Sequence, residues 1–341
     1  MNAPALSFQD PLADNAKAGP HVPSLEDAIL EADNFIRLEI PAKKEILCPW
    51  LFEQSISMVS GWRGEGKTWL GLSLFDAITK GKPFGPWETV TPVPALYLES
   101  ESPASDIQDR LKALGEGERK APLYLYSDAY ANSLGLSRAH LLKSEWISQI
   151  EGLLINKGVK LFGLDNLSSL SPGIDENQKQ DWDPINQWLL SLRFKGISTV
   201  MFHHFNKEGG QRGTSAREDN LDISINLVKP SDYTTEDGCR FILKFSKARI
   251  RTADLPLIAD FEFQLKERDG RVEWVFSATK KKNRVEVLRL LSEKVAQKDI
   301  AGQLGLTNGR VCQIRHELIK NDCIDRAGKH MDKGKGILDE N

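Results

Sequence analysis

The residues from Gly61 to Thr68 have the types and the spacing that bind a nucleoside triphosphate. They read GWRGEGKT and fit the pattern G-x-x-x-x-G-K-[ST], in which glycines let backbone N–H groups turn toward phosphate oxygens. Lys67 would reach the β- and γ-phosphates, and Thr68 would ligate Mg²⁺. A glycine-rich turn that matches by chance is the alternative. We therefore expect ATP and Mg²⁺ as cofactors, with the nucleotide held by Gly61, Trp62, Arg63, Gly64, Glu65, Gly66, Lys67, Thr68 and Trp69.

Carboxylates follow two further apolar runs. The run LFGLD ends on Asp165, which would hold the Mg²⁺ shell, although a buried strand with an incidental Asp would look the same. Asn166 follows it, so the general base must come from elsewhere. We expect Glu101, placed to orient a water toward the γ-phosphate, with Glu99 as the alternate. Either carboxylate could instead be a surface group.

Histidines and two cations end other predicted strands. His203 or His204 could hydrogen-bond the γ-phosphate and move when it leaves, which would couple hydrolysis to the following loop. Alternatively, either histidine could be structural. A zinc pair is disfavoured because adjacent strand residues point to opposite faces. Lys247 and Arg249, two apart, point the same way and could stabilise phosphoryl transfer across a subunit boundary. Surface basic residues are the alternative.

Apolar runs alternating with helical periodicity must position these groups. Residues 55–60, 95–99, 123–126, 160–165 and 198–202 read as strands, and residues 67–78, 103–114, 138–156 and 176–194 read as helices. This order predicts an α/β fold with a mostly parallel sheet and helices on both faces. Ligands sit at the carboxyl ends of such strands, where the candidate residues fall. Residues 221–276 are strand-rich and predict an antiparallel extension.

Composition limits the class of protein. Of 341 residues, 40% are hydrophobic and 27% charged, as in ordinary globular domains. No apolar run approaches the ~18 residues that span a bilayer, and the N-terminus lacks a secretory pattern. The four cysteines are scattered without C-x-x-C, which indicates neither zinc nor a disulfide framework. We expect a cytoplasmic protein with no membrane partner.

The C-terminal 62 residues carry a separate signal. Residues 280–341 hold 14 Lys and Arg against 9 Asp and Glu, whereas the rest of the chain is acidic. Helical spacing from 284 to 295, from 297 to 304 and from 308 to 320, with a turn at 305–307, matches a helix-turn-helix. The alternative is a three-helix module that binds protein. The expected inward residues are Ala301, Leu306, Val311 and Ile314, and the expected DNA-reading residues are Asn308, Arg310, Gln313 and Arg315.

These signals predict three parts of the chain. Residues 1–22 have no periodicity and should be a disordered tail, 23–279 an ATPase domain, and 280–341 a DNA-binding domain. Within them we expect a short helix from Ser24 to Asp33, capped by Ser24, with Ala28 to Leu30 inward. Residues 280–283 should be a linker, and Lys329 to Lys335 a basic wing.

With these motifs in place, the core from about Leu51 to Phe276 resembles the RecA-like ATPases of the plasmid RepA type. These are hexameric replicative helicases, with relatives on phages and mobile islands. The resemblance is carried by GWRGEGKT at 61–68, LYLESE at 96–101 with Arg110, LFGLDN at 161–166 and HHFNKEGGQRGTSAREDNLD at 203–222. It implies Glu101 as catalytic carboxylate, His204 as γ-phosphate sensor, and Lys247 with Arg249 as fingers reaching the next subunit's nucleotide. It covers about two thirds of the chain, and the helix-turn-helix departs from the compact helicase pattern.

The function we expect is that of a ring-forming, ATP-hydrolysing DNA motor or helicase-like replication protein of a plasmid, phage or integrated element. The resemblance implies a homo-oligomer, a hexamer, with single-stranded DNA in its channel. Residues 208–215 are polar, and we expect that they could line this channel. Duplex DNA would bind the C-terminal domain. One alternative is a DNA-binding regulator that uses ATP as an assembly switch. Another is a signalling or recombination ATPase that does not unwind DNA.

Overall fold

The computed structural model describes residues 23–174, 179–205, 220–304, 306–325 and 328–339. It divides the chain into two compact units, Met1–Lys44 and Glu45–Asn341. The tail expected at 1–22 and the channel segment at 208–215 lie outside the described residues. The three-part domain division therefore stays a prediction.

The first unit departs from the helix expected over Ser24–Asp33. A 3₁₀ turn, η1 (Glu26–Ala28), is followed by extended backbone at Ile29 and then by helix α1 (Ala32–Arg37). Ser24 hydrogen-bonds the Asp27 carboxylate through its backbone N–H and its hydroxyl. Ala28 to Leu30 are exposed, so their predicted inward orientation is wrong. A short helix needs a packing surface to be stable, and the described part of this unit contains no buried residue.

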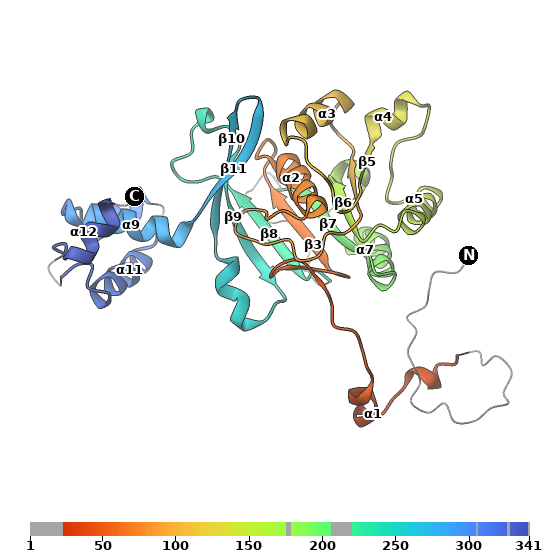
Figure 1. The fold of residues 1–341 in the computed structure, drawn as a ribbon, viewed down its shortest axis with the longest axis horizontal. Coiled ribbons are helices and arrows are strands. Elements are labelled where there is room, and N and C mark those ends of the chain that lie inside the picture. Colours follow the sequence, from red (N-terminus) through yellow and green to blue (C-terminus); the bar gives the residue numbers. More distant parts are fainter. Residues whose placement is uncertain (1–22, 175–178, 206–219, 305, 326–327, 340–341) are drawn as a thin grey trace. The chain divides into compact units, whose positions relative to one another are not determined.

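The second unit is built on a nine-stranded sheet (Figure 1). Its order is β11-β10-β9-β8-β3-β7-β6-β4-β5, with parallel pairing from β8 to β5 and antiparallel pairing from β8 to β11. The α/β fold with a mostly parallel sheet and an antiparallel extension is thereby confirmed. The strands are β3 (Ile56–Gly61), β4 (Ala95–Glu99), β5 (Leu123–Ser127), β6 (Leu161–Asp165), β7 (Ser198–His204), β8 (Ile223–Val228), β9 (Arg240–Ala248), β10 (Phe261–Arg268) and β11 (Arg271–Ala278). A separate hairpin pairs β1 (Glu45–Leu47) with β2 (Leu51–Phe52).

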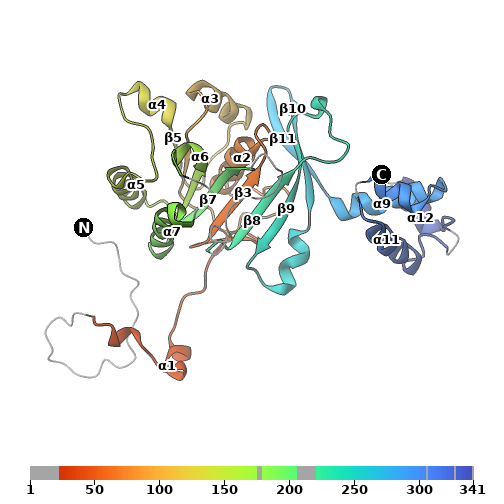
Figure 2. The same cartoon turned by 180° about the vertical axis from the view of Figure 1, so that it is seen from behind.

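Helices cover both faces of this sheet, as Figures 1 and 2 show from opposite sides. Two apolar clusters separate the layers: one joins α2 and α3 to the sheet, and the other joins α5, α6 and α7 to it. The helices of this unit before the C-terminal region are α2 (Lys67–Lys80), α3 (Ala104–Ala113), α4 (Asp128–Ser133), α5 (Ser144–Asn156), α6 (Leu167–Leu170) and α7 (Lys179–Phe194), with 3₁₀ turns η2 (Thr235–Asp237) and η3 (Thr252–Ile258). Among the described residues, no helix is both long enough and apolar enough to cross a bilayer.

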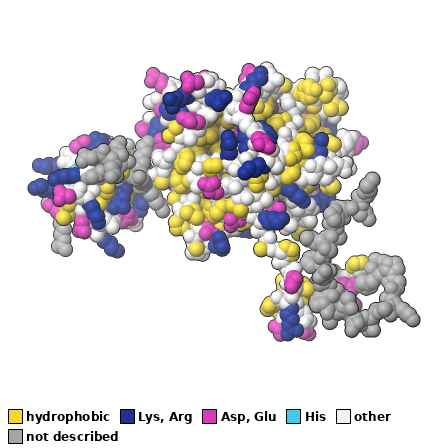
Figure 3. Space-filling view, viewed as in Figure 1, with side chains coloured by type: hydrophobic (Ala, Val, Ile, Leu, Met, Phe, Trp, Pro, Cys, Tyr) yellow, Lys and Arg dark blue, Asp and Glu magenta, His cyan; other side chains and the backbone are white. Residues whose placement is uncertain are grey.

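The C-terminal region is helical and has an apolar core of its own. It consists of α9 (Thr279–Ser292), α10 (Gln297–Gln303), α11 (Asn308–Lys320) and α12 (Asp332–Asp339). The predicted inward residues Ala301, Val311 and Ile314 are buried in its core, and Leu306 packs against it. Figure 3 shows Lys and Arg side chains on the surface of this region, interspersed with Asp and Glu.

Two of the predictions for this region are wrong. The linker expected at 280–283 is part of α9, and the lysines at 280–282 are good helix formers that let the helix begin at Thr279. The wing expected from Lys329 to Lys335 is instead a bridge between Ile324 and His330 followed by α12. In α12, Ile337 and Leu338 gain contact with the apolar core, which an extended wing would leave incomplete.

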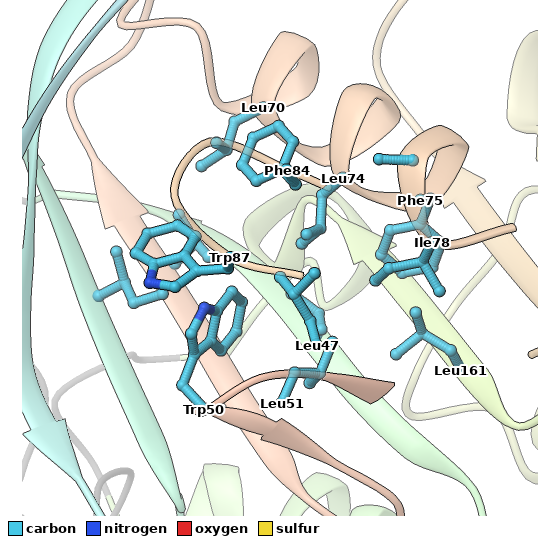
Figure 4. Packing of buried hydrophobic residues seen from close by; sticks show 14 of the residues in the cluster. Leu47, Trp50, Leu51, Leu70, Leu74, Phe75, Ile78, Phe84, Trp87 and Leu161 are labelled. Atoms are coloured by element: carbon cyan, nitrogen blue, oxygen red, sulfur yellow. The ribbon is translucent and has the colours of Figure 1, made fainter. Parts of the chain in front are cut away.

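Helix α2 carries the P-loop lysine and is buried on almost every side. Leu70, Leu74, Ala77 and Ile78 face the core as predicted. Figure 4 shows Trp50 and Trp87 in the same cluster, and their rings meet edge to face with centroids 5.6 Å apart. Burying each such large apolar side chain contributes on the order of 2 kcal/mol. The helix that presents the P-loop is therefore held rigidly.

A shorter helix than expected precedes β6. The periodicity predicted one helix from Arg138 to Asn156, but α5 begins at Ser144. Asp128, at the start of α4, accepts a hydrogen bond from the backbone N–H of Ala139 at 2.8 Å and pairs with Arg138 Nε at 3.0 Å. This buried carboxylate takes over the backbone donor and holds the segment before Ser144 out of the helix.

Candidate nucleotide site

Strand register brings the predicted groups to one edge of the sheet. Gly61, which opens the P-loop, pairs with His204 of β7. Glu99 at the end of β4 pairs with Asp165 at the end of β6. Because these strands are parallel, their carboxyl ends meet at the same edge. The structure therefore brings together the P-loop, Asp165, Glu101 and His204.

The P-loop leaves the first turn of α2 open toward an anion. The helix is preceded by Gly66 with φ 90°, it has no side-chain cap, and its first turn contains no acidic residue. Its N–H groups can therefore donate to phosphate oxygens. A Cβ on Gly66 would lie 2.1 Å from Cys239 Sγ, so both the backbone conformation and the space require glycine here.

Lys67 is buried beneath the loop. Its Nζ donates to the carbonyls of Gly61 at 2.9 Å and Trp62 at 2.7 Å. Burial lowers the pKa of Lys67 from 10.5 to about 8, although the carboxylates of Asp165, Glu65 and Glu101 oppose that shift. The negative charge of a bound triphosphate would compensate the buried positive charge of this ammonium.

Asp165 and Thr68 form the set of oxygen donors expected for Mg²⁺. Asp165 is buried, and Tyr97 Oη donates to its Oδ2 at 2.8 Å. Burial raises the pKa of Asp165, while hydrogen bonds from Thr68 and Tyr97 work against that rise. A carboxylate and a hydroxyl side by side fit a hard divalent cation. These residues therefore suit the expected metal.

Tyr97 was not anticipated from the sequence, although one signal pointed to it. Gly71 interrupts α2, where glycine costs about 1 kcal/mol relative to alanine. A Cβ at Gly71 would lie 2.4 Å from Tyr97 Oη. The glycine thus makes room for the tyrosine that holds Asp165.

The two candidate bases have different environments. Glu101 lines the nucleotide pocket, and its Oε2 lies 3.7 Å from His204 Nε2. The neighbouring imidazole of His204 is the largest cause that lowers the pKa of Glu101. Glu99 is buried, and its Oε1 accepts from the backbone N–H groups of Glu101 and Ser102 at 3.1 and 2.7 Å. Glu99 therefore positions the turn that carries Glu101.

His204 is linked to both sides of the site. Its Nε2 lies 2.9 Å from Asn166 Nδ2, and Asn166 Oδ1 accepts from the backbone N–H of Ser169 to cap α6. The imidazole therefore connects Glu101 to the β6–α6 turn. The preceding His203 is buried, on the opposite face of the strand.

The pocket around these groups has a volume of about 590 Å³. Beyond the phosphate-binding groups it is lined by Trp69, Arg110 and Cys239. The guanidinium carbon of Arg110 lies 5.7 Å from the centroid of the Trp69 ring. Burial raises the pKa of Cys239 to about 12, so its thiol is neutral and acts as a small apolar group. Sequence reasoning missed Cys239 because it comes from a distant loop.

The connection that carries Cys239 is anchored by Arg240. This buried guanidinium contacts Asp232 at 2.9 Å, Asp237 at 3.0 Å and Glu262 at 2.8 Å. The three carboxylates come from the β8–β9 connection and from β10. Arg240 thus holds the loop that presses Cys239 against Gly66.

The side chains of Trp62 and Glu65 do not line this pocket. They line a second cavity, so any contact they make with the nucleotide would be through the backbone. Arg63 and Gly64 do line the nucleotide pocket.

Lys247 and Arg249 lie at the opposite edge of the sheet. Lys247 pairs with Ser224 of β8, which pairs with Met58 near the start of β3. Arg249 donates its backbone N–H to Asp222, one step further from the P-loop. Each of the two cations makes an interaction within its own chain. Lys247 lies level with Met58, at least half a strand before the P-loop, Arg249 lies further away, and neither residue lines the nucleotide pocket.

Comparison with known proteins identifies the sequence family. A family model described as an AAA domain (AAA_25) matches residues 21–210, more than half of the chain. No significant match was found among curated proteins. The crystal structure of the KaiC-like protein PH0186 from the hyperthermophilic archaeon Pyrococcus horikoshii OT3 is similar, with 12% sequence identity and a TM-score of 0.43. That similarity covers 67% of this chain and 93% of the other.

Proposed function

The chain belongs to the AAA domain family of P-loop ATPases, and we propose that it is an Mg²⁺-dependent ATPase that forms rings and acts on DNA. The specific role we propose is that of a motor or helicase-like replication protein of a plasmid, phage or integrated element. The observation that carries the proposal is the convergence of Lys67, Asp165, Glu101 and His204 at one sheet edge.

Each group has a role that its surroundings support. Lys67 and the N–H groups of α2 would hold the phosphates, and Thr68 with Asp165 would hold Mg²⁺, which neutralises phosphate charge when bound. Glu101 is open to the pocket, and its low pKa keeps it ionised and able to accept a proton from water. His204 lies between Glu101 and Asn166 and would act as a sensor of the γ-phosphate.

The position of Lys247 and Arg249 favours a site shared between subunits. Neither can reach its own nucleotide, so a catalytic role requires a second copy arranged head to tail, and such an interface closes into a ring. Arg249→Ala should keep ATP binding and lose hydrolysis. Mixing it with Lys67→Ala should restore part of the activity, because some mixed interfaces pair an intact cation with an intact P-loop. No recovery in rings shown to be mixed would rule the shared site out.

Helix α11 supports a contact with duplex DNA. Asn308 and Gln313 are exposed on it, and Thr307 caps it by accepting from the N–H of Arg310 at 3.2 Å. Gln313→Glu should weaken duplex binding by the full chain about tenfold, since it sets a negative charge against phosphates. Gln303→Glu, an identical change on α10, is the matched control. Equal effects of the two substitutions on duplex binding would mean that α11 is not the DNA-contacting helix. That result would favour a module that binds protein.

A second candidate function rests on the same helix. A regulator that uses ATP as an assembly switch would need a duplex-binding surface, which α11 offers, and would not need a strand in a channel. ATP hydrolysis measured with and without single-stranded DNA separates the two. A motor should be stimulated strongly, whereas a regulator should respond to a defined duplex site.

A further inference from the structure

A second cavity of about 330 Å³ lies beside the P-loop and shares no described lining residue with the nucleotide pocket. Three segments meet there: the P-loop through Trp62 and Glu65, the residue after β7, Phe205, and the end of β8. Register explains the meeting, because Gly61 of β3 pairs with His204, which precedes Phe205. The lining residues from the end of β8 are Asn226, Leu227, Val228 and Lys229.

Two residues that line this cavity each have a buried acceptor oxygen without a hydrogen-bond donor. Glu65 is only 3% exposed; its Oε2 accepts from the N–H of Trp62 at 2.6 Å, while its Oε1 has no partner. The amide oxygen of Asn226 is also buried without a partner. An unsatisfied buried acceptor destabilises the folded protein, so a ligand that donates a hydrogen bond to each oxygen would be favoured.

Aromatic rings form another wall of the cavity. Trp62 is 38% exposed, and Phe205 meets it edge to face with centroids 6.1 Å apart and an interplanar angle of 80°. The exposed part of the indole can stack a flat ring. Lys229 adds a positive charge to the lining, which disfavours a cationic ligand and favours one with a phosphate attached.

We propose that this cavity binds a nucleobase with an exocyclic amine, presented by single-stranded DNA. The base would stack on Trp62 and donate its amine hydrogens to Glu65 Oε1 and Asn226 Oδ1, and Lys229 would contact the backbone phosphate. Only an unpaired base can enter such a cavity, because pairing occupies the amine. The choice of DNA as the source rests on the proposed function; the preference for an amine rests on the two acceptors alone.

The site would also join DNA to hydrolysis. Glu65 belongs to the P-loop, and Phe205 follows His204 directly. A base held by both would fix the loop next to the γ-phosphate position. Single-stranded DNA rich in amine-bearing bases should therefore stimulate ATP hydrolysis more than DNA that lacks them.

The sharpest test compares homo-oligomers of deoxycytidine and deoxythymidine. The two pyrimidines have the same ring size, but cytosine has an amine where thymine has a carbonyl. With a non-hydrolysable ATP analogue filling the P-loop, fluorescence anisotropy should show about tenfold tighter binding of the cytidine oligomer, the scale of one good base contact. Equal binding of the two would overturn the proposal.

Two variants at one position separate chemistry from folding. Asn226→Leu removes the acceptor at similar size and should abolish the preference for cytidine. Asn226→Asp keeps an acceptor and should retain the preference. Thermal melting checks that both fold. If Asn226→Leu folds and still prefers cytidine, the assigned contact is wrong.

Free nucleosides test binding in the cavity independently of the proposed function. Cytidine and thymidine lack phosphates and have little affinity for a P-loop, so they probe the cavity alone. If neither oligomer binds, the contact with single-stranded DNA fails. A preference for free cytidine would then retain the amine-binding cavity, with a free nucleotide as its source. No preference between the nucleosides would overturn the cavity as well.

Discussion

The carboxyl edge of the central strands and the C-terminal helices use charge in opposite ways. At the strand edge, Glu65, Lys67 and Asp165 are almost fully buried. In α9, Arg289 pairs at 2.6 Å with both Glu286 and Glu293, and the three side chains are 36–49% exposed. Burying a charge is costly unless a partner compensates it, whereas an exposed pair costs and contributes little.

This difference shows where each region's function is to be found. Within the described residues, the buried carboxylate oxygens without hydrogen-bond partners are Glu65 Oε1 and Glu99 Oε2, both at the strand edge. Ligands satisfy such groups, so the function of the strand edge is to be inferred from its buried residues. The function of the C-terminal helices is to be inferred instead from the polar surface of α11.

The largest expected effect is on the buried ammonium. Lys67→Ala should reduce ATP hydrolysis about 1,000-fold, because it removes the charge that stabilises phosphoryl transfer. Steady-state phosphate release measures this, with Gln303→Glu in the C-terminal region as a control that keeps full turnover. Unchanged turnover in Lys67→Ala would mean that the interior of the strand edge is not the catalytic region.

The next effect distinguishes two carboxylates of the same edge. Glu101→Gln should lower the rate of hydrolysis about 100-fold and keep ATP binding, as expected when a general base is lost. Glu99→Gln retains an oxygen acceptor for the N–H groups of Glu101 and Ser102 and should change the rate far less. Single-turnover hydrolysis with separately measured ATP binding decides; the reverse result would transfer the catalytic role to Glu99.

Stability should separate the two regions again. Arg240→Ala removes the buried guanidinium that pairs with Asp237 and Glu262, and it should lower the free energy of unfolding by about 3 kcal/mol. Arg289→Ala should lower it far less, because exposed ion pairs contribute little to stability. Urea unfolding followed by tryptophan fluorescence and by circular dichroism covers both regions, because all eight tryptophans precede α9. Similar losses in both variants would mean that the two regions do not differ in how charge pairs contribute to stability.

The smallest effect is a pH dependence of ATP binding. Lys67 has a pKa of about 8 in the free protein, and a bound triphosphate should raise it. Below pH 8 the ammonium is already protonated, so affinity should be flat with respect to this group. Above pH 8 binding requires proton uptake, and the Kd should rise about tenfold per pH unit. Lys67→Arg should remain flat, because arginine does not titrate there; an identical slope in that variant would exclude Lys67 as the cause.

Local sequence was enough to predict most elements of the second unit. The glycines and the lysine of the P-loop, the strand that ends on Asp165 and the helical spacing of α9 to α11 depend on neighbours in the chain, so periodicity identifies them. The same reasoning failed at Arg138 and at Ser24. Near Arg138 the Asp128 carboxylate accepts the N–H of Ala139, which periodicity assigns to a helix. At Ser24–Asp33 the described residues offer no buried surface on which a longer helix could pack.

Tertiary structure alone determined how the site is completed. Tyr97 reaches Asp165 from the neighbouring strand, and Cys239 reaches Gly66 from a loop anchored by Arg240. Strand register also separates Lys247 and Arg249 from their own P-loop and joins Trp62 to Phe205 around the second cavity. Residue spacing along the chain specifies each strand and the face each residue occupies. Which strands become neighbours, and in which register, depends on packing of the whole sheet, so contacts across strands appear only in the folded protein.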